Sequence, residues 1–212
     1  MKPPIKNLIL KDYPNGNVTQ WFSENPNLYA FLDIDGHNGI DIVAPYGTPI
    51  FATTTQTVVE VRDRVDGYGR HVRTVDDKYE YVYGHLSQID VKLGDIVGTG
   101  IEIGKMGNTG FVISGSTPFW KYNPYAGTHL HFGMREFVPK NDKGGYNLQY
   151  QTGLQVTIIN YDNGYKGSID PTPFFDGITD QTEVKRQLML TIVSLSNQVI
   201  SLLERLIAIK NK

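Results

Sequence analysis

Short alternating runs, broken repeatedly by turn-forming residues, occupy most of this chain. From residue 17 to about residue 177, apolar and polar residues alternate between clusters of Gly, Pro, Asn and Asp. Such a period of two is typical of β-strands with one buried face. Five runs are predicted as strands: Thr57–Arg64, Arg70–Val75, Tyr79–Leu86, Thr128–Phe137 and Gln155–Asn160, the last entering a tight hairpin at residues 162–164. Because no helical pattern separates them, a mainly β fold of antiparallel sheets is expected.

Length and charge narrow the class of protein. The 212 residues fit one ordinary domain, or one domain with an appendage. Twenty Lys and Arg residues against 22 Asp and Glu residues give a formal net charge of −2. Nucleic-acid binding would require a strong positive excess or a basic stripe. We therefore expect no nucleic-acid partner.

The side chains available for chemistry are few. The chain contains no cysteine, which excludes disulfides, thiol nucleophiles and cysteine-based zinc sites. Any metal must therefore be held by His, Asp or Glu, and the chain has five histidines.

Four of the histidines occur in suggestive settings. His129 and His131 lie two residues apart on a predicted strand, so both imidazoles are expected to project from one sheet face. His37 and Asp41 share a Gly-containing turn that leads into an apolar run, and His85 ends another predicted strand. Each motif alone is weak, because a surface histidine or a turn aspartate is common.

Together, these five side chains fit a catalytic zinc ion. Such an ion uses three protein ligands and leaves one position open for water. Two ligands can come from the turn that contains Asp41, and one from the His129–His131 pair. The other imidazole of that pair and His85 would remain beside the metal, where they can exchange protons with zinc-bound water of pKa about 7.

Longer motifs follow in the same order along the chain. They are GHNGIDIVAPYGTPI from residue 36, YVYGHLS from residue 81, VKLGDIVGTGIEIGKMGNTG from residue 91, THLHF from residue 128 and DPTPF from residue 170. In these motifs, residues 17–177 resemble the lysostaphin-type zinc endopeptidases, which cut peptide bonds in bacterial peptidoglycan. The resemblance implies a duplicated hybrid motif fold of antiparallel sheets with an open groove.

The resemblance also implies a role for each of the five side chains. His37, Asp41 and His131 are expected to bind Zn²⁺, with water as the fourth ligand. His85 and His129 are expected to lie beyond the ligands, where they orient or deprotonate the water and stabilise the oxyanion. Which of these two is the base stays open. His71 matches no motif and is expected to be a surface residue of its strand.

Two segments depart from the family pattern. Residues 111–127 replace a short linker and contain Phe119, Trp120, Tyr122 and Tyr125. They are expected to form either a loop with its own hydrophobic contacts or a wall or lid beside the substrate groove. Residues 140–167 add a turn-rich hairpin segment to which we assign no chemistry.

The pattern changes after Pro173. The spacing of Asp180 and Glu183 predicts an N-cap pair, and a long helix is predicted over residues 180–212. Its apolar residues recur at spacings of four and three: Val184, Leu188, Ile192, Leu195, Val199, Leu202, Leu206 and Ile209. Either the helix packs on the domain, or it forms a homo-oligomer through residues 180–209. A membrane span over residues 188–209 is the weaker alternative, because its polar residues would be costly in lipid.

The expected function is hydrolysis of peptide bonds in peptidoglycan stem peptides or cross-bridges. The alternative is a non-catalytic, oligomeric structural or wall-binding module. Residues 1–16 are expected to form an N-terminal extension whose apolar run is too short for a signal peptide. Action on the cell wall as a phage lysin or a virion-associated lytic protein fits these expectations.

Overall fold

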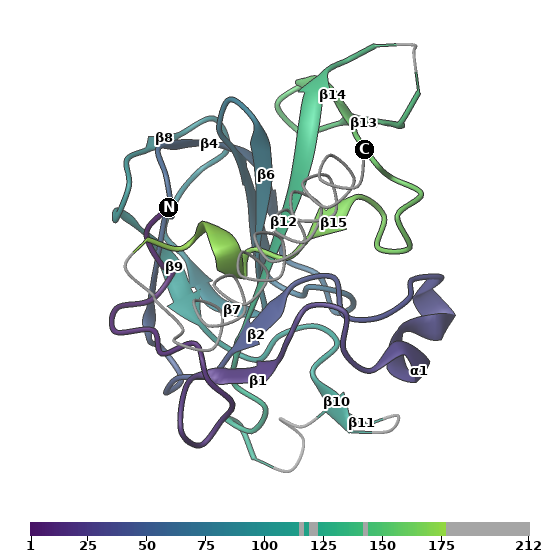
Figure 1. Cartoon of the computed structure of the whole chain (residues 1–212). Helices are drawn as coiled ribbons and strands as arrows, with labels where there is room; N and C mark the ends of the chain where they lie inside the picture. Colours follow the sequence, from purple (N-terminus) through teal and green to yellow (C-terminus); the bar gives the residue numbers. More distant parts are fainter. Residues whose placement is uncertain (115–116, 119–122, 142–143, 177–212) are drawn as a thin grey trace, which may run out of the picture. The chain divides into compact units, whose positions relative to one another are not determined.

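The computed structural model describes residues 1–114, 117–118, 123–141 and 144–176 (Figure 1). The predicted C-terminal helix and its oligomerisation lie outside the described residues, as do Phe119, Trp120 and Tyr122. Residues 1–176 form one compact unit. Among the described residues, no helix has the length and apolar character that crossing a bilayer requires.

A ten-stranded antiparallel sheet positions the functional side chains. Its main path runs in the order β1 (Val18–Gln20), β2 (Ile40–Ile42), β12 (Leu130–Pro139), β6 (Tyr79–Gly84), β5 (His71–Val75), β4 (Gln56–Arg62) and β8 (Ile96–Val97). β14 (Gln155–Ile158) pairs with β12 and with β13 (Tyr146–Gln149), and β15 (Ser168–Ile169) also pairs with β12. The prediction of a mainly β, antiparallel fold is confirmed.

The remaining elements are short. A three-stranded sheet contains β3 (Pro49–Phe51), β9 (Glu102–Met106) and β7 (Leu86–Ile89), and β10 (Ile113–Ser114) pairs with β11 (Thr117–Pro118). One α-helical turn, α1 (Pro26–Tyr29), leads into the 3-10 turn η1 (Ala30–Leu32), and a second 3-10 turn, η3 (Thr172–Phe174), follows β15. Figure 1 shows α1 beyond the end of the sheet that carries β1 and β2.

Two sequence predictions about strands are wrong. The strand expected over Tyr79–Leu86 breaks at His85, whose φ of 61° ends the β6 ladder, and Leu86 begins β7 in the other sheet. The strand at Gln155 also does not form a hairpin across residues 162–164. Both β14 and β15 pair with β12 instead, because one edge of this ten-residue strand accommodates β2, β15 and β14 in succession.

Residues 1–16 pack against the rest of the domain. Ile5, Leu8 and Leu10 are buried, and the backbone of Phe51 donates a hydrogen bond to the Pro4 carbonyl. The chain terminus contacts the closing segment, where the Met1 amino group donates to the Phe174 carbonyl at 2.7 Å. This segment is therefore an integral part of the described fold.

The alternation of side chains gives the central sheet two different faces. Phe132 on β12 and its neighbours Tyr81 and Tyr83 on β6 face the apolar core and are almost completely buried. The opposite face carries His131, Gly133 and Arg135, which pair across the ladder with Gly84, Val82 and Glu80. Polar and ionisable residues therefore follow β12 along a single face.

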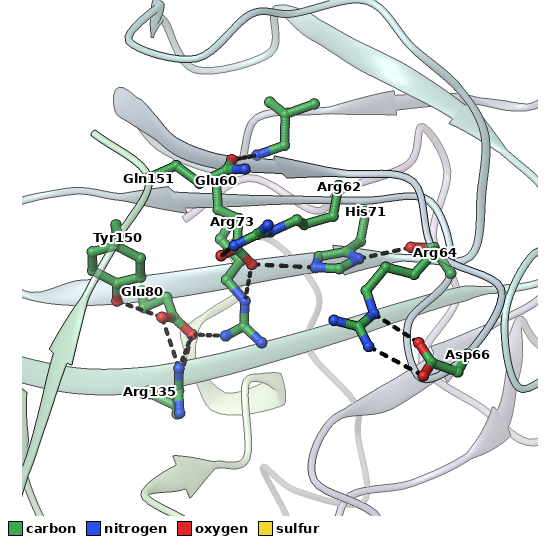
Figure 2. A network of polar contacts seen from close by, with 12 residues as sticks. Glu60, Arg62, Arg64, Asp66, His71, Arg73, Glu80, Arg135, Tyr150 and Gln151 are labelled. Carbon is green, nitrogen blue, oxygen red and sulfur yellow. Dashed lines mark hydrogen bonds and ion pairs between the residues drawn. The ribbon is translucent and has the colours of Figure 1, made fainter. Parts of the chain in front are cut away.

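Glu80 is the centre of an ionic network on this face (Figure 2). Its side chain is fully buried, and the Arg135 guanidinium donates to both of its carboxylate oxygens, at 2.9 and 2.8 Å. Arg73 donates at 2.8 Å, and the Tyr150 hydroxyl also donates. Burial alone would raise the pKa of Glu80, but the two guanidiniums outweigh it and lower this pKa to about 2.

We expect Glu80→Gln to destabilise the fold by about 3–5 kcal/mol at pH 7, because it leaves two guanidiniums without a buried counter-charge. The Glu80 pKa falls on folding from the ordinary 4.5 to about 2. Its stabilisation is therefore present above pH 4.5 and lost as the pH falls towards 2, by on the order of 3 kcal/mol. Urea unfolding at several pH values measures this loss, and the variant should lack it. Glu102→Gln, at a half-exposed pair with Lys105, is the control with an expected change under about 1 kcal/mol.

Candidate metal centre

Three donor atoms converge where β2 meets β12. Asp41 and His131 are direct cross-strand partners, and His37 precedes β2 in the Gly-containing turn. The His37 Nε2 atom lies 2.9 Å from His131 Nδ1 and 3.1 Å from Asp41 Oδ1, and the last two atoms are 3.2 Å apart. The three side chains that the sequence singled out thus lie together, in a group that could hold a metal ion.

Hydrogen bonding alone does not explain this cluster. His37 Nδ1 lies 3.1 Å from the Trp21 carbonyl, which can only accept, so in the neutral ring Nδ1 carries the proton and Nε2 presents a lone pair. The Asp41 carboxylate also only accepts. With both imidazoles neutral, at most one proton, on His131 Nδ1, is therefore shared among three close contacts, whereas a divalent cation would accept electron pairs from all three atoms.

The donor set and its spacing suit zinc. Ligand distances of 2.0–2.2 Å in a tetrahedral site place the ligand atoms about 3.3–3.5 Å apart, close to the separations here. Two imidazole nitrogens and one carboxylate oxygen are also borderline donors of the kind that zinc accepts.

Burial and charge keep these groups in the protonation states that metal binding requires. Burial would raise the pKa of Asp41, but His37 and His129, with hydrogen bonds from His131 and His37, hold it well below its ordinary value. Burial lowers the pKa of His131 to about 4. The cluster therefore contains an ionised carboxylate and a neutral His131 at neutral pH.

His85 and His129 lie next to the cluster. Their ring centroids are 4.6 Å apart, and His129 Nε2 is 3.6 Å from Asp41 Oδ2. The Nδ1 atom of each ring lies 2.7 Å from a backbone carbonyl, that of Thr109 for His85 and that of Gly127 for His129. Both rings therefore present an unprotonated Nε2 when neutral. Burial lowers the pKa of His85 far below 6.5, and neighbouring His129 and His131 add to this effect.

His85 adopts an unusual backbone conformation for its position. Its φ of 61° lies in the left-handed region that few non-glycine residues adopt. The backbone N–H of His85 donates to the Tyr68 carbonyl at 2.8 Å, and the imidazole contacts the Thr109 carbonyl. Tertiary contacts thus hold the strained residue with its imidazole beside His129 and His131.

All five side chains line one groove with a volume of about 1370 Å³. The groove also contains aromatic side chains from separate segments, including Tyr29, Phe31, Tyr46 and Tyr125. Phe111 and Tyr125 belong to the segment 111–127, so the described ends of this segment form part of the groove wall. The five residues therefore share one large groove with aromatic side chains on its wall.

Comparison with known proteins identifies the family. The sequence profile described as Peptidase family M23 matches residues 35–147, which include all five site residues. The chain belongs to peptidase family M23. M23 members are zinc-dependent endopeptidases, and the resemblance to lysostaphin-type enzymes is confirmed.

Three relatives illustrate the extent of this M23 similarity. The chain is 35% identical over 102 residues to the L-Ala–D-Glu endopeptidase of Bacillus subtilis (strain 168), covering 46% of this chain and 29% of the relative. It is 30% identical over 160 residues to the glycyl-glycine endopeptidase ALE-1 of Staphylococcus capitis, covering 72% and 42%. The solved structure of LytU has 29% identity and a TM-score of 0.50, covering 80% of this chain and 92% of that one. The chain thus spans less than half the length of these two curated relatives.

One M23-domain histidine lies elsewhere, and its predicted environment is wrong. His71 was expected on the surface of its strand but is only 4% exposed. Its Nδ1 lies 2.8 Å from the Gly69 carbonyl and its Nε2 lies 3.3 Å from Glu60 Oε1. The His71 side chain faces the ionic network because β5 places alternate residues on the polar face of the sheet.

Sequence reasoning missed the groups that orient the histidines. The carbonyls of Trp21, Thr109 and Gly127 belong to the backbone, so no residue type marks them. Gly39 did carry a signal, as the glycine of the His37–Asp41 turn. A Cβ atom at Gly39 would lie 2.8 Å from both Cε1 and Nε2 of His131 and 2.6 Å from the Phe132 carbonyl oxygen.

We expect Gly39→Ala to weaken zinc binding by about 10- to 100-fold, because the methyl group would displace the His131 ring. Competition with a chromogenic chelator measures the affinity. Gly98→Ala is the matched control, since its Cβ would meet only Ile101 Cγ1, at 3.8 Å. Equal zinc affinity in the two variants would show that Gly39 does not set the position of His131.

Proposed function

We propose that this protein is a zinc-dependent endopeptidase that hydrolyses peptide bonds in bacterial peptidoglycan. The observation that carries the proposal is the convergence of His37 Nε2, Asp41 Oδ1 and His131 Nδ1 within a groove of about 1370 Å³. Membership of family M23 supports the same reaction class.

His37, Asp41 and His131 would hold the zinc ion. When bound, zinc lowers the pKa of a coordinated water and polarises a carbonyl group. The chain itself supplies Nε2 of His85 and Nε2 of His129, whose ring centroids lie 4.6 Å apart next to the proposed ligands. One of them takes the proton of the attacking water, and the other, when protonated, donates a hydrogen bond to the oxyanion of the tetrahedral intermediate. A protonated imidazole can then give its proton to the leaving amine.

The proposed substrate is a stem peptide or a cross-bridge of the wall. The relatives named above include an L-Ala–D-Glu endopeptidase and a glycyl-glycine endopeptidase. Similarity to these relatives therefore does not select one peptide bond. Aromatic side chains along the groove would contact an extended peptide on both sides of the scissile bond. We further propose that the protein acts on the cell wall as a lytic enzyme, with a phage as its source.

Chelation tests the metal directly. We expect 1,10-phenanthroline to abolish the release of fragments from purified walls, because water is a poor nucleophile at neutral pH without the metal. After the chelator is removed by dialysis, about one equivalent of Zn²⁺ per protein should restore the activity. Turbidity measures the lysis, and mass spectrometry of fragments from walls with different cross-bridges identifies the bond. Lysis that persists in chelator would refute zinc dependence. An inactive, metal-free multimer would instead favour the structural or wall-binding alternative.

A further inference from the structure

A second cavity borders the groove on the polar face of the central sheet. Its volume is about 180 Å³, and its lining includes Val82 on β6, Gly133 and Arg135 on β12 and Arg73 on β5. Asn38, Tyr68 and Lys166 line both this cavity and the groove. A molecule in the groove therefore has a neighbouring chamber beside it, which we name the side cavity.

The side cavity is lined by positive charge. Arg73, Arg135 and Lys166 contribute to its lining, whereas none of its described lining residues is an aspartate or a glutamate. The acidic partners Glu80 and Glu60 contact the guanidiniums without lining the cavity. An anion that entered would meet these cations without facing a carboxylate.

The two guanidiniums are held in place and still have donors to offer. Arg135 uses Nε and Nη2 to bind Glu80, and Arg73 uses Nε for Glu60 and Nη1 for Glu80 (Figure 2). Within the described part of the chain, Arg135 Nη1 and Arg73 Nη2 have no hydrogen-bond partner. Because their acidic partners already fix both side chains, little conformational entropy would be lost when an anion binds.

Lys166 adds a donor at the boundary between the side cavity and the groove. Its Nζ atom donates to the Leu32 carbonyl at 2.6 Å, and an ammonium group has two further protons to donate. Lys166 belongs to the segment 140–167, to which the sequence gave no reason to assign chemistry. This segment thus brings a cation to a position close to the proposed active site.

We propose that the side cavity binds a carboxylate group of the peptide that lies in the groove. A volume of about 180 Å³ suits a carboxylate on a short stem. Planar guanidinium donors match carboxylate oxygens in geometry. Arg135 is four residues from His131 on β12, a separation of about 13 Å, so the carboxylate belongs to a residue within about four positions of the scissile bond. The inference rests on the proposed function, since it presumes a peptide in the groove.

The test compares peptides that differ in one functional group. The probes are L-Ala-γ-D-Glu-L-Lys-D-Ala-D-Ala with the D-Glu α-carboxylate free, the same peptide with that group as a carboxamide, and a third with only the C-terminal carboxylate amidated. Binding is measured by NMR titration of the zinc-loaded, full-length His85→Ala protein, which is expected to cleave them at least about 100-fold more slowly. We expect one of the two amidations to weaken binding by about tenfold; which of them does so identifies the carboxylate.

Variants of the lining residues decide whether the side cavity is responsible. Lys166→Gln and Arg73→Gln are each added to the same protein. Each should reduce the ratio of the affinity for the carboxylate probe to the affinity for the carboxamide probe from about ten towards one. Arg62→Gln should leave it unchanged, because Arg62 is 45% exposed, pairs with Glu60 and does not line the cavity. Lys166 is outside the Glu80 network, so its variant tests the site even if Arg73→Gln does not fold.

Two outcomes would overturn the inference: no preference between carboxylate and carboxamide in any probe, or a preference that survives in Lys166→Gln. Neither depends on hydrolysis. If walls are lysed but this preference is absent, the inference fails and the proposed function stands. If the preference is present but walls are not lysed even with zinc, the proposed function fails and the carboxylate site stands.

Discussion

Asp41→Ala is expected to remove zinc from the protein and to lower wall hydrolysis by at least about a thousandfold. The substitution deletes the only carboxylate of the proposed ligand set, and two imidazoles alone would hold the ion weakly. Zinc content falls from about one equivalent to near zero. Atomic absorption of the dialysed protein, together with turbidity assays on purified walls, measures both changes.

The fold itself should survive this substitution. Asp41 is a buried charged residue, and its removal also removes the free-energy cost of keeping that charge away from water. Circular dichroism and thermal unfolding check that point. Asp63→Ala provides the control, since Asp63 is exposed and pairs with Arg70. A full complement of zinc in Asp41→Ala would mean that the ion binds elsewhere and that the proposed ligands are wrong.

Removal of either neighbouring imidazole should separate catalysis from metal binding. We expect His85→Ala and His129→Ala each to reduce the turnover number by about 10²- to 10⁴-fold, because each removes a proton acceptor or a hydrogen-bond donor to the oxyanion. Zinc content should stay near one equivalent, since neither residue belongs to the ligand set. Steady-state hydrolysis and metal analysis of the same preparations make the comparison.

His71→Gln is the matched control for both variants. His71 is buried and contacts Glu60, but it does not line the groove. Its loss should affect stability more than turnover. If His71→Gln were as inactive as His85→Ala, general disruption of the sheet, and not proton transfer, would explain the loss in both.

The site was more predictable from the sequence than the connections around it. The spacing of His129 and His131 places both on one face of any strand, and the nearby turn brings His37 and Asp41 together whatever the distant topology. The break at His85 was missed because alternation continues through Leu86, whereas the left-handed φ depends on contacts with Tyr68 and Thr109. Local pattern cannot reveal such long-range hydrogen bonds.

The extra segment shows the same limit. Residues 155–160 were predicted as a strand, and β14 covers Gln155–Ile158 of this range. The hairpin predicted for this strand at residues 162–164 was wrong. The strand pairs with β12 instead, because the pairing depends on the length of β12 and not on that turn. The position of Lys166 beside the groove follows from that pairing, so the sequence alone could not have indicated the side cavity.

Backbone carbonyls orient three of the imidazoles, and this affects which positions around the site can change in sequence. In His37, His85 and His129 the Nδ1 proton faces a peptide oxygen, at residues 21, 109 and 127 respectively. Every amino acid carries that oxygen, so point mutations at those three positions do not delete the acceptor. The side chains of Trp21 and Thr109 can therefore change without altering which ring nitrogen is basic, whereas Gly127 is restricted by its backbone φ of 70°.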